Sequence, residues 1–282
     1  MSTSIPSTTR RRGFHGRSNI RATLTALLAI ISRDLLVMRR EVITFLLQTL
    51  IQPLFFLFVF GKVLSTIGTA SASFSTLLLP GVVALTVFLT ALQFPAVDLA
   101  RDLGVIREID DRLLAPLQVA LVAVEKVLLA ALRALLGGAF IFPLAFLVLG
   151  GGYQVRTDLL GALIGLMVLT ALAGAALGLL LGVTVPIQML PLIFALVLTP
   201  LIFTGCTFYP WASLGALRWF QVVTLFNPLT YAAEGMRYAM VPPVHGQALQ
   251  TLAPGWVLLA LCSSFIFCLW GGIKLFHRRV VS

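Results

Sequence analysis

Six long apolar runs dominate the pattern of hydrophobic and polar positions, each bounded by charged residues or by proline and glycine clusters. A helix needs about 20 mainly apolar residues to cross a bilayer, and each run is close to that length. The runs predict six transmembrane helices, over residues 42–63, 77–97, 127–149, 159–185, 191–208 and 255–276. The fifth contains Pro191 and Pro200, so protein or water must satisfy the backbone carbonyls that these prolines leave free.

The composition is that of a membrane protein. Of the 282 residues, 59% are hydrophobic and only 11% are charged, whereas about 25% of residues are charged in soluble domains. We expect an all-α integral membrane protein with one transmembrane domain over residues 42–276. A cytoplasmic N-terminal tail and interfacial helix precede it over residues 1–41, and a cytoplasmic tail follows over residues 277–282. The three cysteines lack metal-site spacing, so neither a disulfide framework nor a metal site is predicted.

The placement of positive charge predicts the orientation. With the N-terminus in the cytoplasm, fifteen Lys and Arg residues fall on the cytoplasmic side and three, Arg156, Arg218 and Arg237, on the other. Cytoplasmic loops carry the excess of Lys and Arg, so both termini should be cytoplasmic. We expect a multi-pass protein of the plasma membrane, the inner membrane of a bacterium. Membrane topology thereby explains the net charge of +10, and no nucleic-acid partner is predicted.

Residues 20–40 have the pattern of an amphipathic helix that does not span the membrane. Their cations lie away from the apolar positions on the helical wheel, as in helices that rest in the headgroup plane. We expect an interfacial helix that contacts membrane lipid and leads into the first span. The alternative is a helix packed on the cytoplasmic surface of the protein itself. The apolar positions are Ile20, Leu24, Leu27, Leu28, Ile31, Leu35 and Met38.

An acid-rich cytoplasmic helix is predicted over residues 98–116, between the second and third spans. It contains five of the ten acidic residues of the chain and three arginines, on the side where lipid headgroups are themselves anionic. Lipid contact is therefore unfavourable, and the alternating charge favours a surface that another protein binds. The alternative is a solvated helix without a partner. Its apolar stripe consists of Leu99, Leu103, Ile106, Ile109 and Leu113, and Pro116 ends it.

The stretch 209–254 on the outer side is too hydrophobic for a solvated loop and too interrupted to cross the membrane. Its aromatic residues favour the bilayer interface, which predicts short re-entrant helices that dip into the outer leaflet and return. Asn227 as N-cap and Pro228 as first helical residue start one of them, and on it Glu234 and Arg237, three apart, can pair. These helices either cover the outer end of a pathway or only stiffen the fold.

Two helix faces within the spans are candidates for specific contacts. Lys126, Arg133 and Gly137 share one face of the third span, where Arg133 either reaches the headgroups or lines a wet cavity or a subunit contact. In the fourth span three glycines repeat every four residues, which predicts close packing against a helix of the same or another chain. These glycines are Gly174, Gly178 and Gly182.

The motifs of several enzyme classes are absent from the sequence. No G-x-x-x-x-G-K-[ST] motif for nucleotide hydrolysis, no H-E-x-x-H zinc motif and no G-x-S-x-G nucleophile motif occurs. The chain is therefore not expected to be an enzyme. No carboxylate lies near the middle of a predicted span, which argues against an ion-coupled carrier. An ion-coupled secondary carrier and a non-transporting membrane scaffold that recruits a cytoplasmic protein are two alternative functions for the chain.

The order of these parts resembles the type 2 ABC exporter permeases, which include drug-resistance, nodulation-factor and polysaccharide export subunits. Residues 107–117, Arg-Glu-Ile-Asp-Asp-Arg-Leu-Leu-Ala-Pro-Leu, are similar to a cytoplasmic motif of that family. A second and more specific match is made by residues 204–210, Thr-Gly-Cys-Thr-Phe-Tyr-Pro, together with residues 226–237. Residues 226–237 begin with Phe-Asn-Pro-Leu-Thr-Tyr and end with Glu-Gly-Met-Arg.

The resemblance implies a permease subunit that dimerises with itself or a paralogue and docks on two cytoplasmic ABC ATPase subunits. ATP and Mg²⁺ would bind to those partners, and this chain would hold no cofactor. In such permeases the coupling helix after the second span transmits ATPase closure, and the outer re-entrant helices gate release of a drug, a lipid or a lipid-linked glycan. The implied ATPase contacts are Arg101, Asp102, Arg107, Glu108, Ile109, Asp110, Asp111, Arg112, Leu113 and Pro116. The implied gate residues are Phe208, Pro210, Asn227, Pro228, Tyr231, Glu234 and Arg237.

Overall fold

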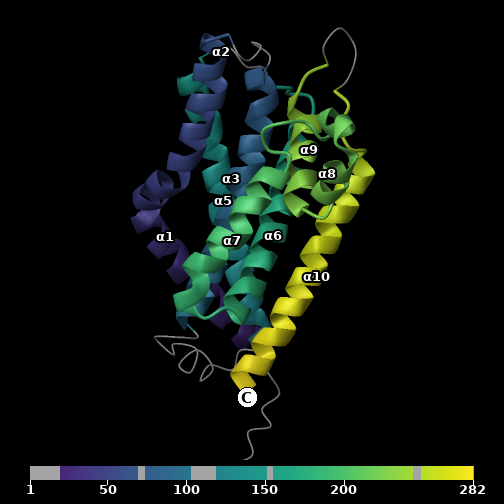
Figure 1. Ribbon diagram of the computed structural model, residues 1–282. Coiled ribbons are helices and arrows are strands. Elements are labelled where there is room, and N and C mark those ends of the chain that lie inside the picture. Colours follow the sequence, from purple (N-terminus) through teal and green to yellow (C-terminus); the bar gives the residue numbers. More distant parts are fainter. Residues whose placement is uncertain (1–19, 69–73, 103–118, 151–154, 244–248, 282) are drawn as a thin grey trace, which may run out of the picture.

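A computed structural model of the chain describes residues 20–68, 74–102, 119–150, 155–243 and 249–281 (Figure 1). All regular structure in these ranges is helical, which confirms the predicted fold class. Six of the described helices are long and apolar enough to cross a membrane, as predicted. Their limits are Met38–Thr66, Phe74–Arg101, Ala120–Leu149, Leu160–Thr184, Ile187–Thr204 and Pro254–Arg279.

The first span is part of a longer helix. Helix α1 (Ile20–Phe56) continues into a π-helical stretch η1 (Leu57–Val63) and the short helix α2 (Leu64–Thr66). Residues 20–40 and the first span therefore form one continuous helix, and contact of residues 20–40 with lipid stays a prediction. Pro53 lies inside α1 and lacks the backbone N–H that a helix needs, so the hydrogen-bond ladder is already weakened before the π-helical stretch begins.

Helix α3 (Phe74–Arg101), the second span, is the centre of the bundle. In its apolar window 78% of the residues are buried, because α5 (Val119–Leu149), α6 (Leu160–Thr184) and α9 (Pro228–Met240) pack around it. Pro80 and Pro95 each remove one backbone hydrogen-bond donor from this helix. Asp98 and Arg101, at the start of the predicted cytoplasmic helix, lie in the last turn of α3, and residues 103–116 of that helix lie outside the described residues.

Close backbone contact joins α6 to α3. A Cβ atom added at Gly178 would lie 2.1 Å from the carbonyl oxygen of Leu92, and one added at Gly174 would lie 2.6 Å from that of Phe88. Gly182 makes the same kind of approach one turn further along. Glycine allows two helices in lipid to come this close, so the glycine face of the fourth span packs within one chain.

Two predicted span limits are displaced by contacts that are distant in sequence. The third span was predicted to begin after Lys126, but α5 begins at Val119 and Lys126 is buried within the bundle. The fifth was predicted to end at residue 208, but α7 (Leu190–Thr204), which follows a 3₁₀ turn η3 (Ile187–Met189), ends four residues earlier. The chain turns there at Cys206, whose φ of 50° lies outside the helical region.

The outer helices expose apolar surface. Only 11% of the apolar window of the first and of the fifth span is buried, and 22% of that of the sixth, which lies in α10 (Pro254–Val281). Large apolar side chains on these helices point away from the bundle, among them Leu47, Leu196 and Phe267. A bilayer or another membrane protein covers such a surface, whereas water would not.

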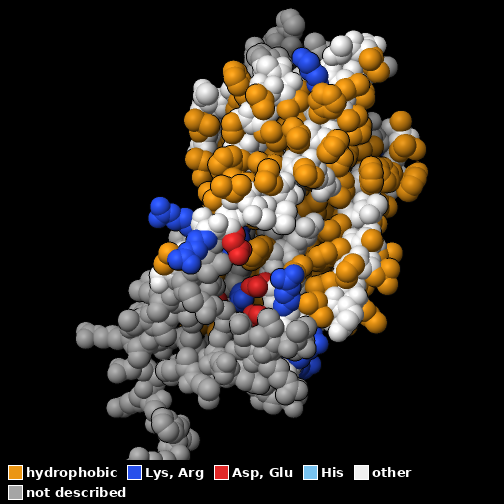
Figure 2. Space-filling view, turned by 90° about the vertical axis from the view of Figure 1, so that its left-hand side faces the viewer, with side chains coloured by type: hydrophobic (Ala, Val, Ile, Leu, Met, Phe, Trp, Pro, Cys, Tyr) orange, Lys and Arg blue, Asp and Glu red, His pale blue; other side chains and the backbone are white. Residues whose placement is uncertain are grey.

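The two ends of the bundle differ in chemistry. The lower end in Figure 1, where α10 ends, contains the end of α3 and the start of α5. The upper end carries α2, a 3₁₀ helix η4 (Trp211–Ala216), α8 (Arg218–Thr224) and α9. Figure 2 shows a wide hydrophobic surface with Lys, Arg, Asp and Glu side chains gathered along its lower border. This arrangement fits a protein whose middle lies in hydrocarbon and whose lower end meets water.

Candidate functional site

A buried ion pair connects the short elements at the upper end. Arg237 and Glu234 of α9 are fully buried, and Nη1 of Arg237 lies 2.9 Å from Oε1 of Glu234, the pairing that their spacing predicted. Nη2 of Arg237 donates to the carbonyl oxygen of Thr207 at 2.8 Å, and Nε donates to that of Leu77 at 3.3 Å. Oε1 of Glu234 also accepts the backbone N–H of Trp211 at 2.9 Å. The pair thereby joins α9 to α3, η4 and the end of α7.

Burial makes this pair sensitive to the loss of either member. Desolvation lowers the pKa of Arg237, and the carboxylate of Glu234 opposes that change by stabilising the charged guanidinium. Arginine nevertheless stays protonated in proteins, so the contact is an ion pair. A buried charge without its partner is strongly unfavourable. In the intact pair, backbone groups bind Nε and Nη2 of Arg237 and Oε1 of Glu234, whereas Oε2 of Glu234 has no partner among the described residues.

Asn227 joins α9 to α7. Its Oδ1 accepts the N–H of Leu229 at 2.9 Å and caps α9, whose first residue is Pro228, as the sequence predicted. Its Nδ2 donates to the carbonyl oxygen of Leu201 at 2.8 Å and to the hydroxyl of Thr204 at 2.9 Å. The last carbonyls of a helix have no partner within it, so one amide satisfies the end of one helix and the start of another.

Two backbone positions allow the upper elements to pack this closely. A Cβ atom added at Gly81 of α3 would lie 1.9 Å from the carbonyl oxygen of Thr207, the atom that Arg237 binds. Cys206 takes the left-handed conformation that turns the chain after α7. Burial raises the pKa of the Cys206 thiol to about 11, so at neutral pH it is protonated and packs as an apolar group.

The other predicted gate residues make packing contacts at the same end. The ring of Phe208 lies 4.9 Å from that of Phe56 and 5.2 Å from that of Phe60, which joins the α7 end to α1 and η1. Pro210 is the N-cap residue of η4. The hydroxyl of Tyr231 donates to the carbonyl oxygen of the residue after α8 at 2.9 Å. All seven of the predicted gate residues therefore lie in one connected region.

A second charged cluster lies at the lower end. Lys126 of α5 is only 6% exposed; its Nζ contacts the carboxylate of Asp98 and lies 3.0 Å from Oδ2 of Asp102. Glu125 beside it is also buried, whereas Arg101 is exposed. The cluster joins the last turn of α3 to α5, the two helices that bound residues 103–118. The other predicted ATPase contacts, at 107–113 and 116, lie outside the described residues.

The face of the third span that carries Lys126, Arg133 and Gly137 packs against other helices of the same chain. The guanidinium of Arg133 lies 3.5 Å from the ring centroid of Phe94 on α3, a cation–π contact. A Cβ atom added at Gly137 would lie 3.1 Å from Cγ2 of Thr49 on α1. Together with the Lys126 cluster, these contacts place the whole face against α1 and α3.

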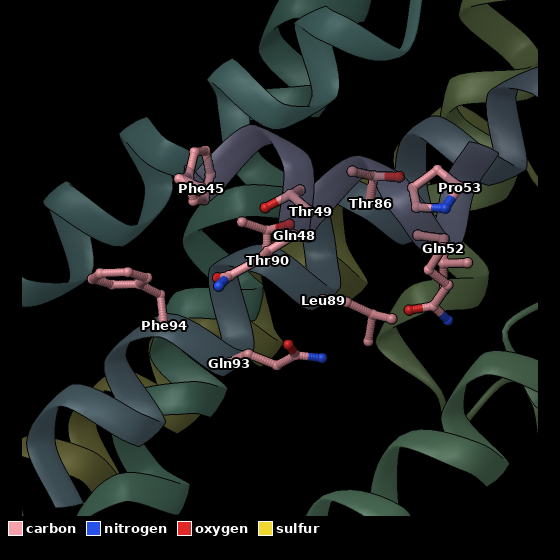
Figure 3. A pocket seen from close by; sticks show the side chains of 11 residues that line it. Phe45, Gln48, Thr49, Gln52, Pro53, Thr86, Leu89, Thr90, Gln93 and Phe94 are labelled. Atoms are coloured by element: carbon pink, nitrogen blue, oxygen red, sulfur yellow. The ribbon is translucent and has the colours of Figure 1, made fainter. Parts of the chain in front are cut away.

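Beside this face, a cavity of about 180 Å³ lies between α1 and α3 (Figure 3). None of its lining residues is charged, and six are polar. These residues were not among the predicted site residues, although their spacing of three and four along each helix is visible in the sequence. The polar lining residues are Gln48, Thr49, Gln52, Thr86, Thr90 and Gln93. The apolar ones are Phe45, Pro53, Leu85, Leu89 and Phe94.

One family of membrane proteins matches most of the sequence. The family model described as ABC-2 type transporter matches residues 25–241, about three quarters of the chain. The chain belongs to this family. No curated protein matches the sequence. As an ABC-2 permease it is a membrane-embedded component of a transporter and not a catalytic domain, and members of its family pair with ABC ATPase subunits.

The specific motif of the ABC-2 permease forms a connected structure. Residues 204–210 and 227–237 supply most of the side chains and carbonyls of the upper network, and α3 supplies the rest. The motif thus holds α7, η4 and α9 against the central helix. Its polar side chains satisfy backbone carbonyls and N–H groups at the ends of these short elements.

Replacement of Lys126 by methionine should lower the free energy of unfolding of the ABC-2 permease by about 1–2 kcal/mol. Asp98 in the last turn of α3 and Asp102 just after that helix lose their cation. Asp102 is buried, but Asp98 retains access to water. Unfolding of the detergent-solubilised protein measures the change. The matched control, Lys62→Met at an exposed position, should change the free energy of unfolding by less than about 0.5 kcal/mol. Equal stability of the two variants would rule out the cluster as a stabilising contact.

Proposed function

We propose that this ABC-2 permease is the membrane subunit of an ATP-driven exporter and works as a dimer, with a second copy or a paralogue, on separate ATPase subunits. The family match over residues 25–241, in a sequence without a nucleotide-binding motif, carries the proposal. The cargo is hydrophobic or amphiphilic, because the spans that form the path are mainly apolar. ATP and Mg²⁺ bind to the partner subunits.

In this proposal the lower end of the bundle faces the cytoplasm of a bacterium, and both termini lie there. Positive charge supports this orientation. Arg101, Arg278 and Arg279 belong to the last turns of α3 and α10 at the lower end, whereas Arg156 and Arg218 lie near the upper end. The first half of α1 then lies where its cations contact lipid headgroups.

The ATPase contact in this proposal is the acid-rich stretch 98–116. Its charge supports a protein partner, and the Lys126 cluster supports mechanical coupling, since it joins α3 and α5 on the two sides of that stretch. Closure of the ATPases then shifts α3 and α5 as packed units, a rigid-body transition. The residues proposed to touch the ATPase are Arg107, Glu108, Asp110, Asp111 and Arg112.

The upper elements form the outer gate in this proposal. Arg237 of α9 binds α3, Glu234 of α9 binds η4, and Thr230 of α9 binds the end of α8. A shift of α3 therefore carries these three elements, the outer cap, with it. Release of the cargo then depends on movement of η4, α8 and α9 as a unit. The same contacts are what an element that only stiffens the fold would need, so transport assays on variants of the cap decide between the two roles.

Reversal of two charges, Glu108→Lys together with Asp111→Lys, should lower ATPase stimulation about tenfold without loss of folded, inserted permease. Like charges placed opposite each other disfavour a protein–protein contact strongly. The measurement compares ATP hydrolysis by the co-purified complex with hydrolysis by the ATPase alone. The matched control, Asp158→Lys, reverses an exposed acid at the upper end, where its pairing with Arg156 contributes little, and should leave stimulation unchanged.

Three outcomes contradict the proposal. Unchanged stimulation in the double variant removes the coupling assignment. Transport that persists without ATP and collapses with the proton gradient indicates an ion-coupled carrier. An ATPase that co-purifies with the wild-type permease but is neither stimulated nor linked to transport indicates a scaffold.

A further inference from the structure

The cavity between α1 and α3 is polar at a depth where the helices are otherwise apolar. Gln48 and Gln52 of α1 lie one turn apart, and Thr86, Thr90 and Gln93 of α3 follow one another by steps of four and three, so each set forms a stripe. Both stripes lie in the middle turns of their spans. Figure 3 shows side chains of both stripes around the cavity.

Most of these polar groups have no partner within the described part of the chain. The hydroxyl of Thr86 donates to the carbonyl oxygen of Val82 at 2.8 Å. The amides of Gln48, Gln52 and Gln93 form no hydrogen bond with any described residue. An amide at this depth is unfavourable unless something satisfies it. Water, another chain or a cargo molecule must therefore occupy the cavity.

The chemistry of the lining selects among cargo classes. No Asp, Glu, Lys or Arg is among the lining residues, so a charged headgroup would lose its hydration without gaining a counter-charge there. Arg133 borders the cavity, with its guanidinium 3.5 Å from the ring centroid of the lining residue Phe94, but it is not itself a lining residue. Amides and hydroxyls both donate and accept hydrogen bonds, which matches the hydroxyl groups of sugars and polyols.

The size and shape of the cavity suit a headgroup. Its volume of about 180 Å³ is several times the roughly 30 Å³ that one water molecule occupies in the liquid, so one small ring fits. Gln48 and Gln52 are exposed on the open side, and Phe45 and Phe94 add apolar surface. Acyl chains can then stay on the apolar surface of α1 while the headgroup enters.

We infer that this groove binds the uncharged, hydroxyl-rich headgroup of an amphiphilic cargo, such as a sugar-bearing lipid, through the amides of Gln48, Gln52 and Gln93. The inference rests on the proposed export function and narrows its cargo. It favours a neutral glycolipid over an anionic lipid and over a purely hydrophobic drug.

Equilibrium binding to the full-length permease in phosphatidylcholine nanodiscs tests this inference. The probes are three fluorescent lipids with identical acyl chains, namely a glucosyl lipid, phosphatidylglycerol and diacylglycerol. The wild type should bind the glucosyl lipid at least about tenfold more tightly than the other two, because only this headgroup is both uncharged and rich in hydroxyls. The triple variant Q48L/Q52L/Q93L should lose that preference.

Two further variants keep the test decisive. Gln188→Leu removes an exposed glutamine of η3 outside the cavity and should leave the preference intact. Thr90→Val keeps the size of a lining residue and removes its hydroxyl, so it should weaken glucosyl-lipid binding severalfold even if the triple variant fails to fold.

Several results would overturn the inference. They are a preference for phosphatidylglycerol, equal binding of all three lipids by the wild type, and an unchanged preference in T90V and the triple variant. Loss of self-association in the triple variant with glucosyl-lipid binding retained would assign the glutamines to a contact between copies. Binding is measured without ATP or a partner, so failure here leaves the ATPase assay, and thus the export proposal, unaffected.

Discussion

Replacement of Arg237 by leucine should lower the free energy of unfolding by about 3–5 kcal/mol. The carboxylate of Glu234 would remain buried without its cation, and the carbonyl oxygens of Thr207 and Leu77 would lose their donor. Proteins are stable by only about 5–15 kcal/mol, so little folded permease should be recovered. The yield of monodisperse protein and its unfolding in detergent measure the effect.

The control for this variant is Arg218→Leu, which removes an exposed arginine from α8 and should change stability by less than about 0.5 kcal/mol. The double variant E234Q/R237M removes both charges and should recover part of the stability that R237L loses. R237L protein that unfolds like the wild type would show that the ion pair does not hold the upper elements together.

Replacement of Gly178 by alanine should destabilise the bundle by about 3 kcal/mol. The new methyl group would lie 2.1 Å from the carbonyl oxygen of Leu92, and a backbone atom of a packed helix cannot move away alone. Helices α6 and α3 must separate, which loosens the contact along its length. Thermal unfolding of the purified permease measures the loss.

The matched control lies on the same helix. A Cβ atom at Gly161 has no neighbour within 4 Å, and alanine is the better helix former by about 1 kcal/mol, so Gly161→Ala should be neutral or slightly stabilising. The prediction depends on the difference between the two sites. Equal stability of the two variants would mean that α6 and α3 are not in backbone contact.

The hydropathy pattern predicted the six spans well because a span depends mainly on local composition. The pattern misplaces the end of a span where a residue distant in sequence changes the environment of a charged side chain. Lys126 was taken to mark the edge of the third span, since a lone cation normally stays at the membrane surface. Two acids on α3 neutralise it, and their position depends on how the helices pack.

The candidate site likewise contains contacts that the sequence predicts and contacts that depend on the packing of distant segments. The cap at Asn227 and the pairing of Glu234 with Arg237 were predictable, because each connects residues two or three apart on one helix. The contacts of Arg237 with Leu77 and the fit of Gly81 were not, since they join segments more than a hundred residues apart. The α1–α3 cavity was missed because each polar stripe is unremarkable until the other helix faces it.

The two prolines of α3 divide the central helix into three segments. Pro80 lies among the contacts with the upper elements, between Leu77 and Gly81, and Pro95 lies between the cavity lining and the two acids that bind Lys126. A helix bends most easily where a proline has removed a backbone hydrogen bond. In the proposed transport cycle, the lower end of α3 bends at Pro95 while the residues that line the cavity keep their positions.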